Sequence, residues 1–401
     1  MKKLTYFIKI TRYDYPELAQ LTVSFLFVFF AFNMLSFSFA QNTSRDSITA
    51  ETNQIGGINN YLPLSEYTYA GHENYSLDGS LPITVFDSPE TNLIDSINDF
   101  VPLSQFTYAG QQRYTLDGSL PRAVTQIKST NLAILSGLYL GTMVGLHIYQ
   151  HNAWWKDQRR GFHFEEDWVS ALQADKSGHA YGGYMASYLM SEGLMASGFD
   201  WNDATLWGAI FGCAYQTYVE VNDGFAKEWG FSPSDWYFDA LGPLFFLAQH
   251  HVEALQNITP KWQYIPTTWY SQPQIVRPAT VFDDYNSSSF YWSLNVYNIL
   301  PEKLKPYWLP WLNIAVGYGA NAVDAVSDPN EPPDQLSQRR YIVCLDYDLV
   351  KLLPDGGPFW NWFRQSLDLI KFPAPSFEFS NGITRFRLFY PFHLHLGSLK
   401  F

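Results

Sequence analysis

Ionisable residues whose types and spacing could bind a metal ion or transfer protons are concentrated between residues 167 and 242. This segment contains DKSGH at 175–179, EVNDG at 220–224 and SPSDWYFDALG at 232–242. Residues three or four apart lie on the same face of a helix. Three pairs have this spacing: Asp175 with His179, Glu220 with Asp223, and Asp235 with Asp239.

Three neighbouring helices that each present such a pair are an arrangement from which metal sites and acid–base sites in helical bundles are built. We hypothesise a divalent metal site formed by His179, Glu220 and Asp223. If the chain is an enzyme, we expect catalysis from Glu220, Asp239 and His179, with Glu220 or Asp239 as the general base. Ligand binding would then involve Asp175, Lys176, Asp223 and Asp235.

Each of these residues also has a structural interpretation. Asp175 can cap the helix that follows it, and Asp235 can complete a capping box behind Ser232. Lys176 can be a solvated charge whose stem covers apolar surface, and His179 can be a core histidine. A buried ion pair with Lys176 would account for a carboxylate in an apolar helix without any ligand.

Four helices are expected to position these residues. We predict a first helix from about Leu132 to 152 and a second from Asp175 to Met195. A third should begin with Asn202 as its N-cap and end at Val221. The fourth should begin at Ser232 with Pro233 in its first turn, kink near Pro243 and end at Gln256.

Small residues recur every four positions on three of these predicted helices. Such stripes permit close approach of helix backbones. They comprise Gly137, Gly141 and Gly145 on the first helix, Gly178, Gly182 and Ala186 on the second, and Gly208 and Gly212 on the third.

Tryptophans are grouped at the ends of the predicted helices, for example Trp154, Trp168, Trp207 and Trp236, as in the aromatic belts of membrane proteins. The apolar stretches of the later helices are only about 10 to 16 residues, short of the roughly 20 that span a bilayer. Three arrangements therefore remain open: a bundle that lies at or partly in a membrane, a bundle whose helices span the membrane, and a soluble bundle.

After residue 259 apolar residues recur at every second position, as in a strand, instead of at every third or fourth position, as in a helix. Alternation predicts antiparallel strands at 292–296, 312–318, 341–349 and 386–396, with an amphipathic helix at 359–370 among them. Four or five strands are too few to close a transmembrane barrel, which takes at least eight. The predicted fold class is α+β: a membrane-associated, glycine-rich four-helix bundle followed by an antiparallel β-rich region.

The N-terminal third has a different organisation. Residues 1–40 contain an apolar run after basic residues and end in SFA, which predicts a cleaved signal peptide or an uncleaved anchor. Residues 41–126 form an acidic segment with two copies of a 22-residue repeat, at 61–82 and 100–121. We interpret the repeats as a spacer or as paired docking motifs for an envelope protein. The bundle and the β-rich region are assigned to 127–258 and 259–401.

The amino-acid composition argues against some classes of function. Charged residues make up 16% of the chain, below the roughly 25% of soluble domains, and aromatic residues make up 18%. The net charge of −13 argues against a nucleic-acid partner, because phosphates require basic surfaces.

The ordered set of motifs resembles the YfiM-like family of predicted periplasmic lipoproteins and, more remotely, the VanZ-like envelope membrane proteins. The resemblance covers residues 160–256. It rests on DKxxH at 175–179, Glu220 with Asp223, and Ser-x-x-Asp-x-x-x-Asp-x-x-Gly at 232–242. The chain departs from lipoprotein members because it has no lipid-anchor cysteine, and from VanZ-like proteins because Asp239 stands where those have Asn.

These observations predict an exported envelope protein of the periplasm or outer membrane, associated with a membrane. Its polar site would bind a metal ion or the head group of an envelope lipid or glycan precursor. A metal-assisted envelope hydrolase is the first alternative. The second is a structural or interaction protein without catalysis.

Overall fold

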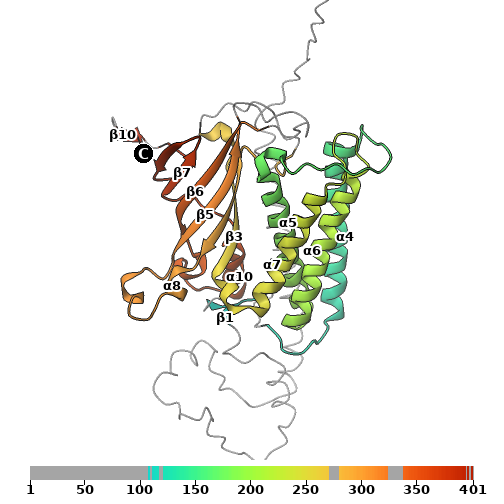
Figure 1. Cartoon of the computed structure of the whole chain (residues 1–401). Coiled ribbons are helices and arrows are strands. Elements are labelled where there is room, and N and C mark those ends of the chain that lie inside the picture. Colours follow the sequence, from blue (N-terminus) through green and yellow to red (C-terminus); the bar gives the residue numbers. More distant parts are fainter. Residues whose placement is uncertain are drawn as a thin grey trace, which may run out of the picture.

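The computed structural model of the chain places a helical bundle beside an antiparallel sheet (Figure 1). It describes residues 107–108, 111–116, 121–270, 280–323, 337–393, 395–396 and 399–400. This combination of helices and antiparallel strands confirms the α+β class. The predicted signal segment, the first repeat and most of the second lie outside the described residues.

Three helices form the packed part of the bundle: α5 (Ala174–Ala196), α6 (Trp201–Asp223) and α7 (Pro233–His251). A fourth, α4 (Ser129–Gln150), lies along their outer side (Figure 1) and continues as the π-helix His151–Trp155. Because α5 also contacts the sheet, it separates the sheet from α6. Short 3-10 turns occur at Ser170–Gln173, Glu253–Asn257, Thr267–Trp269 and Lys305–Tyr307.

The helix caps explain where these helices begin. Ser232 caps α7 as predicted, since its Oγ accepts a hydrogen bond from the Asp235 amide at 3.2 Å. The predicted cap of α6 was wrong: Asp200, not Asn202, accepts from the Asp203 amide at 3.0 Å. A carboxylate two residues earlier reaches the free N–H groups of the first turn, so α6 begins at Trp201.

Glycines set the spacing of α5, α6 and α7. A Cβ atom on Gly212 would lie 2.2 Å from Ser187 Oγ, and one on Gly242 would lie 2.0 Å from the Ala180 carbonyl oxygen. Any side chain at either position would push two helices apart. The predicted close approach is therefore confirmed for Gly212, whose neighbour Gly208 also meets the backbone of α5.

The glycine stripe on α4 does not pack against another helix of the described chain. No heavy atom of the described residues lies within 4 Å of a Cβ built on Gly137, Gly141 or Gly145. The prediction that this stripe packs against a helix was wrong for the described chain. Instead, α4 approaches the bundle through other positions, such as Leu135 against Gly193 and His147 beside Tyr218.

Six antiparallel strands follow in sequence order. They are β3 (Ile258–Tyr264), β4 (Ser288–Leu294), β5 (Leu312–Asn321), β6 (Gln338–Tyr347), β7 (Ser376–Ser380) and β8 (Ile383–Arg387). Two further pairs, β1 (Thr107–Tyr108) with β2 (Gln111–Gln112) and β9 (His395–Leu396) with β10 (Leu399–Lys400), stand apart from this sheet.

The alternation located β4, β5 and β6, and β3 and β7 were missed. The strand predicted at 386–396 was largely wrong, because it shares only residues 386 and 387 with β8 and continues into turns. Val296 and Leu349, predicted as strand ends, instead begin the short helices α8 (Val296–Ile299) and α9 (Leu349–Leu352). Asn295 and Asp348 explain this, because each caps the turn that follows with its side-chain oxygen. The predicted amphipathic helix corresponds to α10 (Pro358–Leu367).

Substituting Gly212→Ala should destabilise the protein by about 1 to 3 kcal/mol, the usual cost of overpacking. The matched change Gly141→Ala should be neutral or stabilising by up to about 1 kcal/mol, because alanine favours a helix more than glycine does. Thermal or denaturant unfolding in detergent measures both. Equal effects of the two substitutions would contradict the packing described for α6.

Candidate functional site

The ends of three helices bring the predicted residues together. Asp175 is the second residue of α5, Glu220 lies in the last turn of α6, and Asp235 lies in the first turn of α7. The chain enters α5 through a turn in which Ala171, Leu172 and Gln173 all have positive φ. Positive φ is uncommon for such residues. The turn brings the preceding loop, which contains Asp167, next to the start of α5.

The ammonium group of Lys176 is the centre of an ion cluster. Its Nζ lies 2.5 Å from Asp167 Oδ1, 2.8 Å from Asp175 Oδ2 and 2.5 Å from Asp235 Oδ1. Lys176 is 1% exposed, so the interpretation of this residue as a solvated charge was wrong. Asp167 was not among the predicted residues, because it lies in a loop that has no helical spacing to the others.

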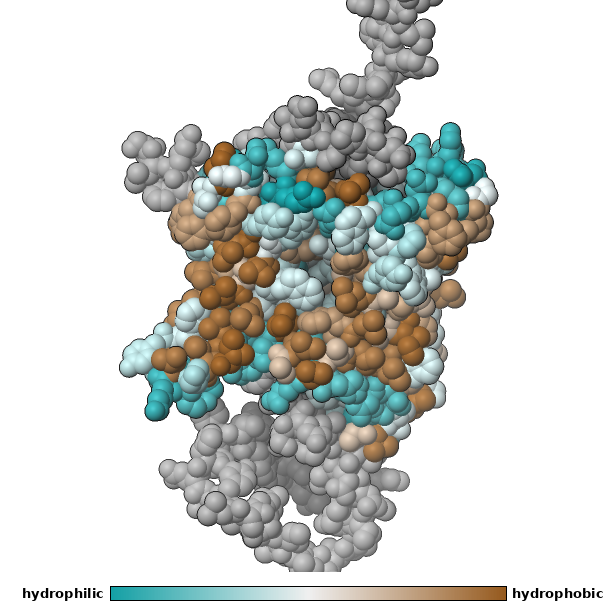
Figure 2. Space-filling view, viewed as in Figure 1, coloured by the Kyte–Doolittle hydropathy of each residue, from teal (hydrophilic) through white to brown (hydrophobic). Residues whose placement is uncertain are grey.

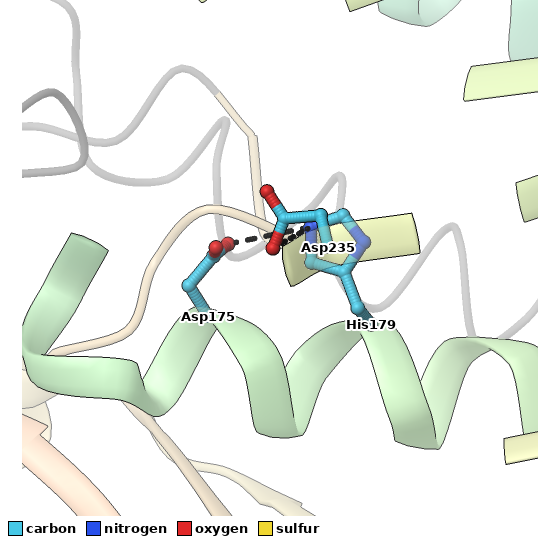
Figure 3. A group of neighbouring side chains, drawn as sticks. All are labelled: Asp175, His179 and Asp235. Atoms are coloured by element: carbon cyan, nitrogen blue, oxygen red, sulfur yellow. Dashed lines mark ion pairs between the residues drawn. The ribbon is translucent and has the colours of Figure 1, made fainter. Parts of the chain in front are cut away.

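The imidazole of His179 lies between carboxylates of two helices. Its Nδ1 is 2.8 Å from Asp239 Oδ1, and its Nε2 is 3.5 Å from Asp175 Oδ1 and 3.6 Å from Asp235 Oδ1. Figure 3 shows the ring with Asp175 and Asp235 on its Nε2 side. The side chain of His179 is 18% exposed, whereas the Asp239 side chain is fully buried.

Glu220 and Asp239 lie on the other side of His179. The Ser232 amide donates to Glu220 Oε2 at 2.9 Å, and Gln216 Nε2 donates to Asp239 Oδ1 at 2.9 Å. Asp239 Oδ2 is buried and has no hydrogen-bond donor in the described part of the chain.

Two groups of potential metal ligands share His179. One consists of Asp175, His179 and Asp235, and the other of His179, Glu220 and Asp239; in each, the ligand atoms lie within 4.8 Å of one another. Five of the seven predicted site residues therefore belong to these groups, and Lys176 contacts one of them.

Asp223 has a different environment from the one predicted. Its side chain accepts a hydrogen bond from the indole N–H of Trp155, and its carbonyl oxygen accepts from Ala226 and Gly230. It belongs to neither ligand group of the described residues. The spacing of Glu220 and Asp223 placed both on one helix face, but the side chains of the last turn diverge.

Charge pairing fixes the protonation states around Lys176. Burial disfavours the charged forms of Asp175, Lys176 and His179. The cations nevertheless hold the pKa of Asp175 well below its usual range. The surrounding carboxylates raise the pKa of Lys176 and hold the pKa of His179 well above its ordinary value. These three groups are therefore charged at neutral pH.

Other carboxyl groups at the site keep their protons. Burial and the nearby charge of Asp175 raise the pKa of Asp235 to about 10. Burial also raises the pKa of Glu220 to about 9, with further contributions from Asp223 and Asp239 that outweigh His179. The pKa of Asp223 rises to about 7, mainly because of burial. A bound cation would ionise any of these carboxyl groups that ligated it.

Tyr285 and Gln216 complete the site from outside the predicted motifs. The Tyr285 hydroxyl, which comes from the loop before β4, donates to Asp175 Oδ1. Gln216, one turn before Glu220, bonds both Asp239 and the His179 carbonyl oxygen. The i, i+4 spacing of Gln216 and Glu220 was the signal that could have identified Gln216.

Comparison with known proteins agrees with part of the predicted resemblance. Residues 162–248, which include α5, α6 and most of α7, match the model of a family described as "Predicted periplasmic lipoprotein (DUF2279)". No curated protein and no solved structure matches the chain. This similarity to a periplasmic lipoprotein-like family supports an exported protein of the cell envelope.

The raised pKa values of Glu220 and Asp235 predict how stability depends on pH. Both groups bind protons more tightly in the folded state than in the unfolded state, where carboxyl pKa values are about 4. Stability should therefore fall as pH rises from about 5 towards 9, by at most about 1.4 kcal/mol per pH unit for each group. Denaturant unfolding of metal-free protein in detergent at several pH values measures this slope.

Glu220→Gln should reduce that slope, because glutamine mimics the protonated acid and does not titrate. Glu302→Gln is the matched control, since the Glu302 side chain is 85% exposed, and it should leave the slope unchanged. A slope that Glu220→Gln does not alter would show that Glu220 is ionised in the folded protein.

Proposed function

We propose that this exported envelope protein binds a divalent metal ion through His179, Glu220 and Asp239. The observation that carries the proposal is the buried Oδ2 atom of Asp239, which has no donor among the described residues. An unsatisfied buried carboxylate oxygen is costly, and a cation would satisfy it. Imidazole and carboxylate ligands suit Zn²⁺, Mn²⁺ or Fe²⁺.

This group is favoured over the one formed by Asp175, His179 and Asp235. Two of those carboxylates already contact Lys176 at 2.8 and 2.5 Å, and a metal ion there would be repelled by the ammonium group. In the described chain, neither Glu220 nor Asp239 forms an ion pair with a lysine or arginine.

The Lys176 cluster has a supporting role in this proposal. Metal-bound histidines commonly donate their second ring N–H to a carboxylate, which fixes the orientation of the ring. If Nδ1 of His179 binds the ion, its Nε2 faces Asp175 and Asp235 at 3.5 and 3.6 Å. Those carboxylates, held by Lys176, would orient the ligand.

A second candidate function is metal-assisted hydrolysis in the envelope. It is favoured by the 18% exposure of His179, which gives solvent a route to a group whose carboxylates are buried. A metal ion held there would supply Lewis-acid chemistry, and whichever of Glu220 and Asp239 was ionised and did not ligate the ion would be the general base. The head group of an envelope lipid or glycan precursor would supply a substrate with oxygen ligands.

We also propose that the bundle inserts into an envelope membrane. One described helix, Ser129–Trp155, is long and apolar enough to cross a bilayer, and only 6% of its apolar window is buried. Exposed apolar residues continue on α6 and α7, including Ile210, Phe211 and Leu244. The metal site lies at one end of α5, α6 and α7, near the exposed interfacial residues Trp168 and Tyr237.

Purified protein loaded with Zn²⁺ or Mn²⁺ should retain about one ion per chain after dialysis. Glu220→Gln and Asp239→Asn should each weaken retention about 10-fold to 100-fold or more, because each removes a ligand or its charge. Elemental analysis and isothermal titration calorimetry measure stoichiometry and affinity. Affinity should also rise with pH up to about 9, since both His179 and Glu220 must lose a proton to bind the ion.

Asp223→Asn is the matched control, because Asp223 is a nearby carboxylate outside both ligand groups. It should leave metal retention unchanged. Absence of a stoichiometric ion in folded wild-type protein would overturn the proposal and favour a purely structural charge cluster. Dependence on Asp223 but not on Asp239 would instead favour the ligand set predicted from the sequence.

A further inference from the structure

The two faces of the six-stranded sheet have the reverse of the usual polarity. Side chains on the face toward the interior are buried and mainly polar or charged. They include Lys261, Gln263, Ser289, Ser293, Asn313, Arg340, Asp346, Ser376, Glu378 and Arg387, each at most 8% exposed. Many are paired: Lys261 Nζ lies 2.8 Å from Asp346 Oδ2, and Arg387 Nη1 lies 3.1 Å from Glu378 Oε2.

The opposite face is apolar. Helices α5 and α7 cover its edge at β3 and β4, where Tyr181 packs beside Trp262 and Phe245 beside Trp292, and the rest of the face is exposed. Strand register places one apolar side chain of each strand beside the next, in a row that crosses five strands. This row is Trp292, Val316, Val343, Phe377 and Phe386, which are between 43% and 52% exposed. Ile314, Tyr341 and Phe379 extend the apolar surface on the same face.

Water does not favour this arrangement. A sheet of a soluble protein buries its apolar face and exposes its polar one, because apolar burial drives folding. Sheets in outer membranes show the opposite pattern, with an apolar outward face about 25 Å tall and a polar interior. The ten residues of β5 and of β6 extend about 33 Å, enough to cross such a layer.

The apolar surface forms a band that is bounded at both ends and includes both the sheet and the helices. Figure 2 shows apolar residues across the middle of both the sheet and the helices, with hydrophilic bands at the two ends. Exposed apolar residues also lie on α4, α6 and α7, for example Val144, Phe211 and Leu244. Interfaces between two copies usually bury one patch, whereas here apolar surface occurs on both layers.

We propose that the outer face of the sheet contacts the acyl chains of a lipid bilayer. The sheet and the bundle together form one membrane-embedded unit, in which the bundle covers one edge of this apolar face and the polar residues lie on the other face of the sheet. The inference extends the proposed membrane insertion of the bundle to the β-rich region. It is independent of metal binding.

Site-directed spin labelling in liposomes of phosphatidylethanolamine and phosphatidylglycerol tests this surface. Single cysteines would replace Val316 on the sheet, Val144 on α4 and Glu302 in an exposed loop, in a Cys213→Ala, Cys344→Ala background. The ratio of oxygen to nickel-chelate accessibility should be several-fold higher at 316 than at 302. Position 144 should resemble 316.

Each other outcome overturns the inference. A label at 316 as accessible to the nickel chelate as that at 302 would place the sheet in water; if 144 remained lipid-exposed, the proposed insertion of the bundle would stand. Spin–spin coupling between labels at 316, with low access to both reagents, would identify a second copy as the occupant. A low ratio at both 144 and 316 would overturn both membrane proposals.

Discussion

The buried ammonium group of Lys176 is the constraint on which the rest of the bundle depends. A lysine that is 1% exposed must be neutralised, and the three acidic side chains that contact it, among them the ionised Asp175, come from the loop before α5, from α5 and from α7. This requirement fixes the ends of two helices against each other. Glycines on α6 and α7 then allow the backbones to meet closely enough for His179 to reach Asp239.

The interior of the molecule is polar in both layers. In the bundle, protonated carboxyl groups and an ion cluster surround His179. In the sheet, Lys261 and Arg340 occupy the inward face with their acidic or carbonyl partners. Apolar side chains are correspondingly abundant on the outside. Buried polar networks that are well satisfied rigidify a structure. If the exposed apolar side chains contact lipid instead of water, burying them inside the protein would no longer stabilise the fold.

The sequence predicted the helices and most of the site because both depend on local spacing. Pairs at i and i+4 identified His179, Asp235 and Asp239, and the Ser232 cap located the start of α7, although the helix ends at His251 and not at Gln256. Asp167 could not be found this way because it lies in a loop without helical spacing to Lys176, and Tyr285 because its contact with Asp175 joins segments 110 residues apart. β7 was missed because its short stretch from Ser376 to Ser380 has only two apolar residues.

The central claim is that His179, Glu220 and Asp239 hold a metal ion, and anomalous X-ray scattering from zinc-loaded crystals tests it most directly. We predict one anomalous peak within about 2.0 to 2.2 Å of a nitrogen of His179 and of carboxylate oxygens of Glu220 and Asp239. A fully ordered site without a peak, or with the ion bound by other residues, would contradict the account.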